Sequence, residues 1–170
     1  YPLLATIGDN AFDAAGNVDS KIELHSLPSS VSIADNAFLK LEGTYDLNCL
    51  CQDGSHGLTR DLYERAVEAD DLSLFADATC IPSYAFHNTF MHYQGNVTLA
   101  GLSKLITIDK YAFQEMAGTL TMTGEYPLLA TIGDHSFSKA GNAASHIKFI
   151  NGLPSLSKIS RNAFEEVAGI

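Results

Sequence analysis

Apolar residues recur along the chain in a six-residue string that reads Ile-x-x-x-(Ala or Ser)-Phe. The string occupies residues 7–12, 33–38, 81–86, 108–113, 132–137 and 159–164, and a degenerate copy at 62–67 falls in the one gap of double length. Seven sites at a period in the mid-twenties of residues indicate a solenoid. In a solenoid, a unit too small to bury its own Ile and Phe stacks on copies of itself.

A segment in which apolar and polar residues alternate follows each string. Period-two alternation predicts a β-strand with one buried and one solvated face. The expected strands are 21–25, 46–50, 71–75, 96–100, 119–123 and 146–150. A Leu-Pro or Tyr-Pro pair follows several of them, and proline ends a strand because it lacks the N–H that a central ladder needs. Residues 58–69 carry apolar residues at helical spacing instead, which predicts the one substantial helix.

Together these patterns predict a leucine-rich-repeat solenoid with a parallel β-sheet on one face and short helical or 3₁₀ turns, carrying the Ala-Phe pairs, opposite. Residues 1–170 are expected to form a single solenoid domain of about seven repeats, of which the repeat around 52–75 is degenerate. Tyr1–Asp9 recurs unchanged as Tyr126–Asp134, which indicates duplication of a block of repeats. Neither end carries capping sequence, so we expect the chain to be a fragment of a longer array.

Two strings, Leu105–Phe113 and Leu156–Phe164, read Leu-x-x-Ile-x-x-x-Ala-Phe in full. They resemble the BspA-like, or Treponema pallidum-type, leucine-rich repeat, and the resemblance covers nearly the whole chain, with Gln52–Arg65 as the poorest stretch. The repeats here run a few residues longer than is usual in that family, and glycines mark the turn where Cys or Asn is usual. The resemblance implies secreted or cell-surface proteins that bind hosts, matrix or other cells, and it implies no shared catalytic activity.

Charge and motifs narrow the function classes. Lys plus Arg number 10 and Asp plus Glu 20, which gives a net charge of −10 without a basic cluster, so no nucleic-acid partner is expected. No apolar run is long enough to predict membrane insertion. No phosphate loop, dinucleotide fingerprint, zinc-protease motif or nucleophile elbow occurs. His87 with His92, and the acidic run at Asp70–Asp71, lack the spacing of a metal site, so we expect no enzyme, no cofactor and no metal.

The solvated strand face is the predicted binding site, because outward positions of successive strands form rows in a solenoid. The expected central row, with Phe75 as an apolar spot beside it, is Glu23, Asn48, Ser73, Thr98, Thr121 and Lys148. Such a surface suits a protein or glycan ligand, although ordinary solvated strand positions would look the same.

Two covalent features are predicted. Asn96-Val97-Thr98 is the one Asn-x-Ser/Thr sequence and offers an N-glycosylation site at Asn96. A disulfide between Cys80 and either Cys49 or Cys51 is expected in an oxidising compartment, and three small buried residues are the alternative.

These observations support two hypotheses. The first is a non-enzymatic binding or adhesion module, extracellular or at the cell surface, that uses the strand face. The alternative is a structural protein that assembles end to end, copy on copy, into filaments or a surface coat. It follows from the uncapped ends, because an open solenoid end exposes unpaired strand edges.

Overall fold

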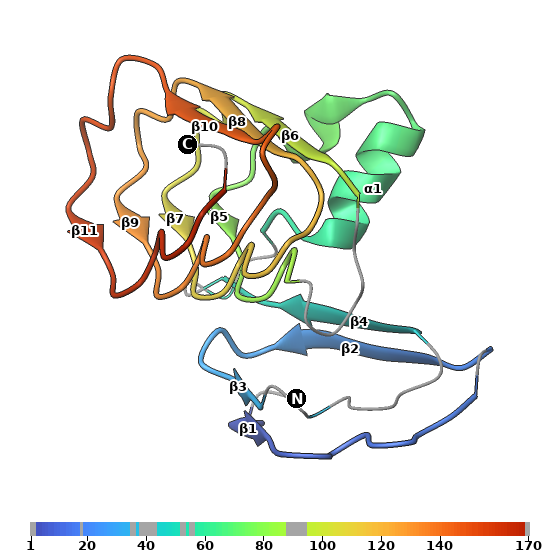
Figure 1. The fold of residues 1–170 in the computed structure, drawn as a ribbon. Helices are drawn as coiled ribbons and strands as arrows, with labels where there is room; N and C mark the ends of the chain where they lie inside the picture. The colour runs from blue at the N-terminus through green and yellow to red at the C-terminus, as the bar shows by residue number, and fades with distance from the viewer. Residues whose placement is uncertain are drawn as a thin grey trace.

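The strands and helices of the chain follow the repeat. The computed structural model describes residues 3–17, 19–34, 37, 44–51, 54, 57–87 and 95–168, with the backbone alone for 44–48 and 61. The strands in this part are β1 (Thr6–Ile7), β2 (Lys21–Leu27), β3 (Ser32–Ile33), β4 (Thr44–Cys49), β5 (Cys80–Ile81), β6 (Val97–Ala100), β7 (Thr107–Ile108), β8 (Leu120–Gly124), β9 (Thr131–Ile132), β10 (His146–Phe149) and β11 (Lys158–Ile159). The helices are α1 (Arg60–Glu68) and the 3₁₀ helix η1 (Leu72–Phe75) (Figure 1).

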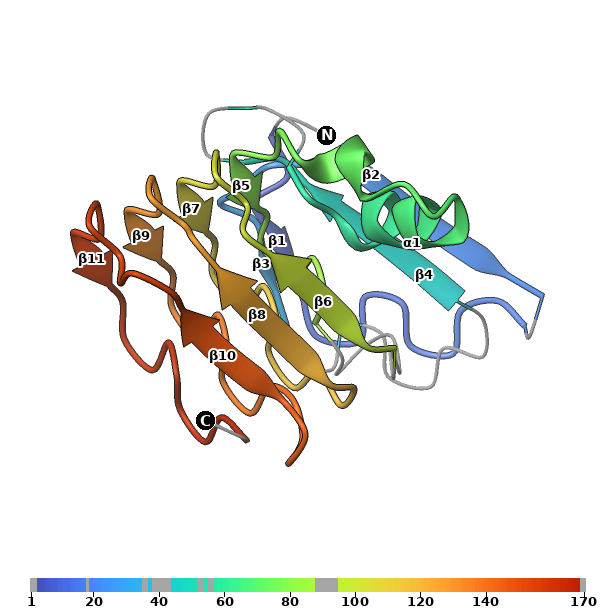
Figure 2. The same cartoon turned by 90° about the horizontal axis from the view of Figure 1, so that it is seen from above.

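The coils of the C-terminal half contribute three long and four short strands to the described structure, and like strands stack in parallel. The long strands β6, β8 and β10 form one sheet, and the short strands β5, β7, β9 and β11 form a second. Figure 2 shows the two rows side by side, each advancing in chain order. The predicted leucine-rich-repeat solenoid with parallel strands is confirmed.

The Ala-Phe pairs lie in tight turns that hydrogen-bond from coil to coil. In five copies of the string the residue before the Ala or Ser has a positive φ; these residues are Asn10, Tyr84, Tyr111, His135 and Asn162. A left-handed residue at the third position closes a four-residue turn and cannot continue a helix, so the predicted turns stay single turns. Backbone bonds then join neighbouring coils, as from the Phe86 N–H to the Ala112 carbonyl at 2.7 Å.

A stack of phenylalanine rings fills the centre of the C-terminal coils. The rings of Phe86, Phe113, Phe137 and Phe164 lie in nearly parallel planes with centroids 5.1, 5.1 and 5.0 Å apart. The first three are fully buried, and Ile81, Ile108 and Ile132 of the short strands form a second buried column. Burial of each such side chain contributes roughly 1.5–3 kcal/mol, so repetition of one residue type per coil produces the core.

The degenerate repeat interrupts the solenoid. The prediction of a helix over 58–69 is confirmed by α1, whose first turn is capped by the Thr59 hydroxyl accepting from the Leu62 N–H at 3.3 Å. The prediction of a strand over 71–75 is wrong, because these residues form η1. The Asp71 carboxylate accepts from the Ser73 N–H at 3.0 Å and caps η1, and the Phe75 ring packs 5.8 Å from the Tyr63 ring.

The N-terminal repeats therefore form their own short sheets. In the described part of the chain, β2 pairs with β4 and β1 with β3, and none of the four pairs with β5 to β11. A second core cluster, which includes Leu27, Val31 and Ile33, packs against Tyr84 of the C-terminal coils. The Lys110 ammonium also donates to the Val31 carbonyl at 2.8 Å. A single domain over 1–170 and a longer array both stay predictions.

Candidate functional site

The solvated face of the long-strand sheet is built from three strands in register. Val97 and Leu99 of β6 and Met122 of β8 point into the core and are fully buried, so the alternate residues face outward. Neighbouring strands in a sheet lie about 4.8 Å apart, which sets the spacing along each row. The two outward rows are Thr98, Thr121 and His146, and Ala100, Thr123 and Lys148.

The predicted row differs from this register at two places. Lys148 lies beside Thr123, so it belongs to the row next to that of Thr121. Glu23 pairs with Asp46 and not with Asn48. In both cases the observed strand register differs from the predicted one by two residues. A shift of two keeps each side chain on the same face of the sheet, so the alternation of apolar and polar residues cannot reveal it.

Two predicted residues do not belong to a strand face. Ser73 is exposed on η1, and Phe75, predicted as an apolar spot on the surface, is 4% exposed and lies in the core. With η1 in place of a strand, β4 and β6 belong to different sheets. The structure therefore brings Thr98 and Thr121 together and leaves Glu23 on a separate sheet.

The Glu23 carboxylate has charged neighbours of its own. It pairs with the Lys21 ammonium, and His25 Nε2 lies 3.7 Å from its second oxygen. The hydrogen bond and positive charge of Lys21 hold the pKa of Glu23 below its usual value. All three side chains are exposed, and exposed pairs of this kind contribute little to stability.

Asn96 lies directly before β6, at the edge of the strand face. It is exposed, and its side-chain oxygen accepts from the Thr119 N–H at 2.9 Å, which ties it to the next coil. N-glycosylation of Asn96 stays a prediction, and a glycan there would border the Thr98 row.

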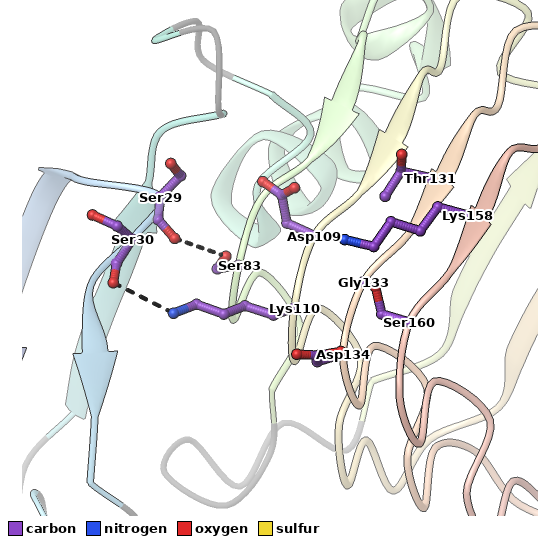
Figure 3. A pocket seen from close by; sticks show the side chains of 10 residues that line it. All are labelled: Ser29, Ser30, Ser83, Asp109, Lys110, Thr131, Gly133, Asp134, Lys158 and Ser160. Carbon is purple, nitrogen blue, oxygen red and sulfur yellow. Dashed lines mark hydrogen bonds between the residues drawn. The ribbon is translucent and has the colours of Figure 1, made fainter.

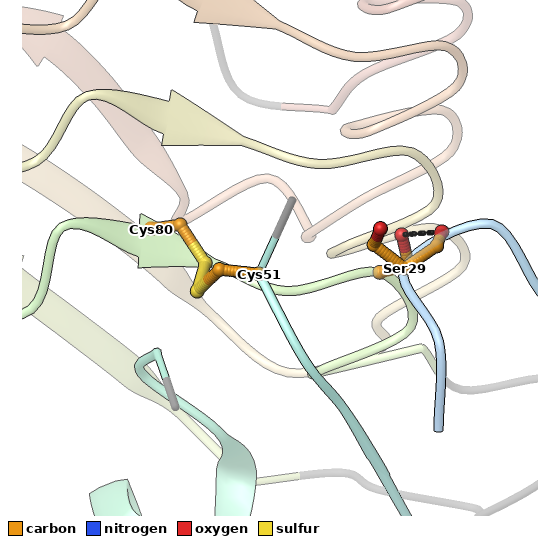
Figure 4. The surroundings of a disulfide bond; sticks show 4 residues. Ser29, Cys51 and Cys80 are labelled. Carbon is orange, nitrogen blue, oxygen red and sulfur yellow. Dashed lines mark hydrogen bonds between the residues drawn. A yellow bond between two sulfur atoms is a disulfide. The ribbon is translucent and has the colours of Figure 1, made fainter. Parts of the chain in front are cut away.

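The disulfide is formed by Cys51 and Cys80 (Figure 4), with Cα atoms 6.1 Å apart and 29 residues of separation. Cys49, the alternative partner, is a free buried thiol, and burial raises its pKa to about 12. Gly57 packs on the bridge, since a Cβ there would come within 2.6 Å of the Cys80 sulfur. The disulfide thus joins the segment after β4 to the start of β5, on either side of α1.

A groove lies beside the short-strand sheet, and sequence analysis did not identify it (Figure 3). Its volume is about 580 Å³, and its lining comes from the loop before β3 and from four coils of the C-terminal half. The lining residues are Ser29, Ser30, Ser83, Asp109, Lys110, Thr131, Gly133, Asp134, Lys158 and Ser160. The polar residues that follow the Ile of each string were the one sign of this groove in the sequence. Its opposite wall could not be predicted, because the loop that forms it is about 50 to 130 residues away in sequence.

Within the described ranges, no group of three His, Cys, Asp or Glu side chains could hold a metal ion, and His92 lies outside those ranges. No helix of the described chain is both long and apolar enough to cross a bilayer.

Stacked parallel strands joined by Ala-Phe turns define the class of this protein as a leucine-rich-repeat solenoid, a type that typically provides a non-enzymatic scaffold for protein interaction. The family model of the BspA type leucine rich repeat region matches residues 79–170 in six copies. Since this is more than half of the chain, the chain belongs to the BspA-type leucine-rich repeat family, which is often associated with surface adhesion. Neither the curated proteins nor the solved structures contain a match.

Proposed function

We propose that this chain is a non-enzymatic binding module, displayed outside the cell or at its surface, that binds a protein or glycan on the outward face of β6, β8 and β10. The observation that carries the proposal is the register of Thr98 with Thr121 and of Thr123 with Lys148. It places hydroxyl and amine groups in rows on a surface whose backbone is fixed by the core beneath.

The chemistry of this face suits polar recognition. Each threonine hydroxyl both donates and accepts a hydrogen bond, and Lys148 adds three donors. Val97, Leu99 and Met122 anchor the opposite side of the same strands in the core. A ligand therefore meets strands whose backbone is already ordered, and little backbone entropy is lost on binding.

A location outside the cell is supported by covalent chemistry. Disulfides persist in oxidising compartments, and the chain has one between Cys51 and Cys80. The same compartments in eukaryotes add glycans at sequences such as that of Asn96.

Array binding tests the proposal. The protein is applied to glycan and extracellular-protein arrays, and hits are measured with a double variant, Thr98→Arg and Thr121→Arg, and with Ser103→Arg as an exposed control away from the strands. The double variant should weaken binding at least tenfold, which is about 1.4 kcal/mol, and the control should not. Unchanged binding by a folded double variant would refute the role of the strand face.

End-to-end assembly is the second proposed function, and the two ends of the sheets support it. In the described part of the chain, no strand covers the outer edge of β11, where Ile159 is 55% exposed. Ala5–Asp9 has the sequence of Ala130–Asp134, the segment that stacks on β7 inside the solenoid. The N-terminal repeat thus carries a sequence already suited to an edge like that of β11.

Sedimentation velocity over a range of concentrations tests this second function. Association should increase with concentration and should fall in a Gly8→Val variant, because its counterpart Gly133 has no room for a Cβ against the neighbouring coil. A monomer at every concentration would contradict assembly, whereas assembly that Gly8→Val leaves intact would contradict this docking mode alone.

A further inference from the structure

The groove beside the short-strand sheet has two walls that the fold holds at a fixed separation. One wall is the loop before β3, with Ser29 and Ser30, and the other is the outer side of the short strands. The Lys110 ammonium donates across the groove to the Ser30 carbonyl at 3.5 Å, and the Ser83 hydroxyl donates to the Ser29 carbonyl at 3.4 Å (Figure 3). Lys110 also donates to the Val31 carbonyl at 2.8 Å. A groove of this kind is formed before any ligand arrives.

The floor of the groove is polar and deeply placed. Ser83 is 1% exposed and Asp109 is 2% exposed, and both line the cavity. Burying a carboxylate costs several kcal/mol unless polar partners surround it, so such a floor is a poor contact for an apolar ligand. Gly133 also lines the groove, and its lack of a side chain lets its backbone lie against that of Asp109 and Lys110.

The rim adds hydrogen-bonding groups of both kinds. Thr131 and Ser160 contribute hydroxyls, and Lys158 contributes an amine. Asp134 is held in place because its carboxylate accepts from the Arg161 N–H at 3.0 Å. In the described part of the lining, no side chain is aromatic or large and apolar.

The charges of the lining balance. Among the described residues that line the groove, two are acidic, Asp109 and Asp134, and two are basic, Lys110 and Lys158, in a protein whose net charge is −10. A bound anion would meet the two carboxylates and a bound cation the two amines, so an uncharged ligand suits the groove best. The volume of about 580 Å³ lies within the range of about 300–1,000 Å³ that is usual for ligand sites.

We propose that this groove binds a neutral sugar, as a free saccharide or as a residue of a glycan. Adjacent sugar hydroxyls each donate and accept, which matches a lining of carboxylates, hydroxyls and amines. The carboxylate of Asp109 accepts from hydroxyls at the floor, and Thr131 and Ser160 contact the exposed side of the ring. This inference rests on the glycan-binding form of the proposed function, but it uses a surface separate from the strand face.

Titration with uncharged sugars, followed by amide chemical shifts in NMR, tests the proposal. The probes are glucose, galactose, mannose and N-acetylglucosamine with their disaccharides, and inorganic phosphate as the anion. At least one sugar should give saturable shifts centred on Ser83, Asp109 and Gly133. Thr131→Val, which removes one hydroxyl at nearly constant volume, should weaken binding at least threefold, and Asp109→Asn at least tenfold.

Control variants separate this site from the strand face. Ser103→Ala and the Thr98→Arg, Thr121→Arg double variant should leave the groove affinity unchanged, and melting temperatures establish that each variant is folded. Absence of saturable shifts with every sugar, or tighter binding of phosphate than of any sugar, would overturn the inference. Shifts that centre on the strand face instead would support the proposed function and refute the groove as the site.

Discussion

Gly8 and Gly133 occupy the same position in the two copies of one nine-residue segment, yet only Gly133 is crowded. A Cβ at Gly133 would lie 2.6 Å from the Lys110 backbone nitrogen and 2.7 Å from the Asp109 carbonyl carbon. A Cβ at Gly8 would meet nothing within 4 Å. Because Tyr1–Asp9 and Tyr126–Asp134 are identical, the effects of alanine at the two glycines on stability should differ mainly through the stacking of coils.

The structure allows the difference in stability to be estimated. Gly133→Ala forces a methyl group against backbone atoms that cannot rotate away, and overpacking of this kind costs about 1–3 kcal/mol. Neither glycine has a positive φ, so Gly8→Ala should stabilise the fold by about 0.4–1 kcal/mol through the unfolded state. The two variants should therefore differ by about 1.4–4 kcal/mol, which corresponds to at least about 3 °C in Tm for a chain of this size.

Thermal and urea unfolding, followed by circular dichroism, measures this difference against the parent protein. The expected order of Tm is Gly8→Ala at or above the parent and Gly133→Ala below it. Equal Tm values for the two variants, or a larger loss for Gly8→Ala, would refute the inference that β9 stacks against β7 at the described distance.

Three further outcomes are expected. Phe113→Ala should lower the free energy of unfolding in urea by about 3–5 kcal/mol. Phe164 is half-buried and has one ring neighbour in the stack, so Phe164→Ala should cost less. Equal losses for the two variants would contradict the stack. Reduction by dithiothreitol should lower the free energy of unfolding by about 3–4 kcal/mol, because the disulfide closes a loop with a separation of 29 residues, and a Cys51→Ala variant should be insensitive to the reductant. Burial raises the pKa values of Cys49 and Tyr126 to about 12. Because the unfolded chain releases these protons at lower pH than the folded chain does, their contribution to stability is present below pH 9 and is lost as the pH rises to 12. Cys49→Ala should flatten that decline, and an unfolding midpoint that does not depend on pH would contradict the reasoning.

The C-terminal coils could be predicted from the sequence because each structural role has its own residue type. Ile in the short strand, a small residue and then Phe in the turn recur at nearly constant spacing, so the ring stack from Phe86 to Phe164 follows from the string itself. The positive φ that keeps each turn from becoming a helix had only a partial signal in the sequence. Asn10, His135 and Asn162 are of residue types that adopt this conformation more readily, whereas Tyr84 and Tyr111 are not.

The strand face could be predicted in kind but not in register. Alternation determines which residues face outward, and a shift of two residues preserves it, so Lys148 was placed one row away from its observed neighbour. Between Leu24 and Leu27 the pairing of β2 with β4 also shifts, and Ser26 has a φ of 57° there. A local irregularity of this kind has no signature in the apolar pattern.

The error at 71–75 has a different cause. The alternating order of Leu72, Ser73, Leu74 and Phe75 is typical of a strand, but the Asp71 cap and the aromatic contact with Tyr63 favour η1. The groove was not predictable because a loop and four coils far apart in sequence form it. Its lining depends on how the N-terminal repeats pack on Tyr84, which is a tertiary contact.

The bridge between Cys51 and Cys80 also has a mechanical meaning. If the chain were pulled by its two ends, as an adhesive protein is when its ligand moves away, tension would pass from Cys51 directly to Cys80 through the bridge. The segment between them, including α1 and η1, would carry no load. Fully extended, this segment, which spans a sequence separation of 29, would lengthen the chain by about 100 Å, so the oxidised molecule is a shorter tether than the reduced one. The redox state of the surroundings would thereby set how far the protein reaches under force.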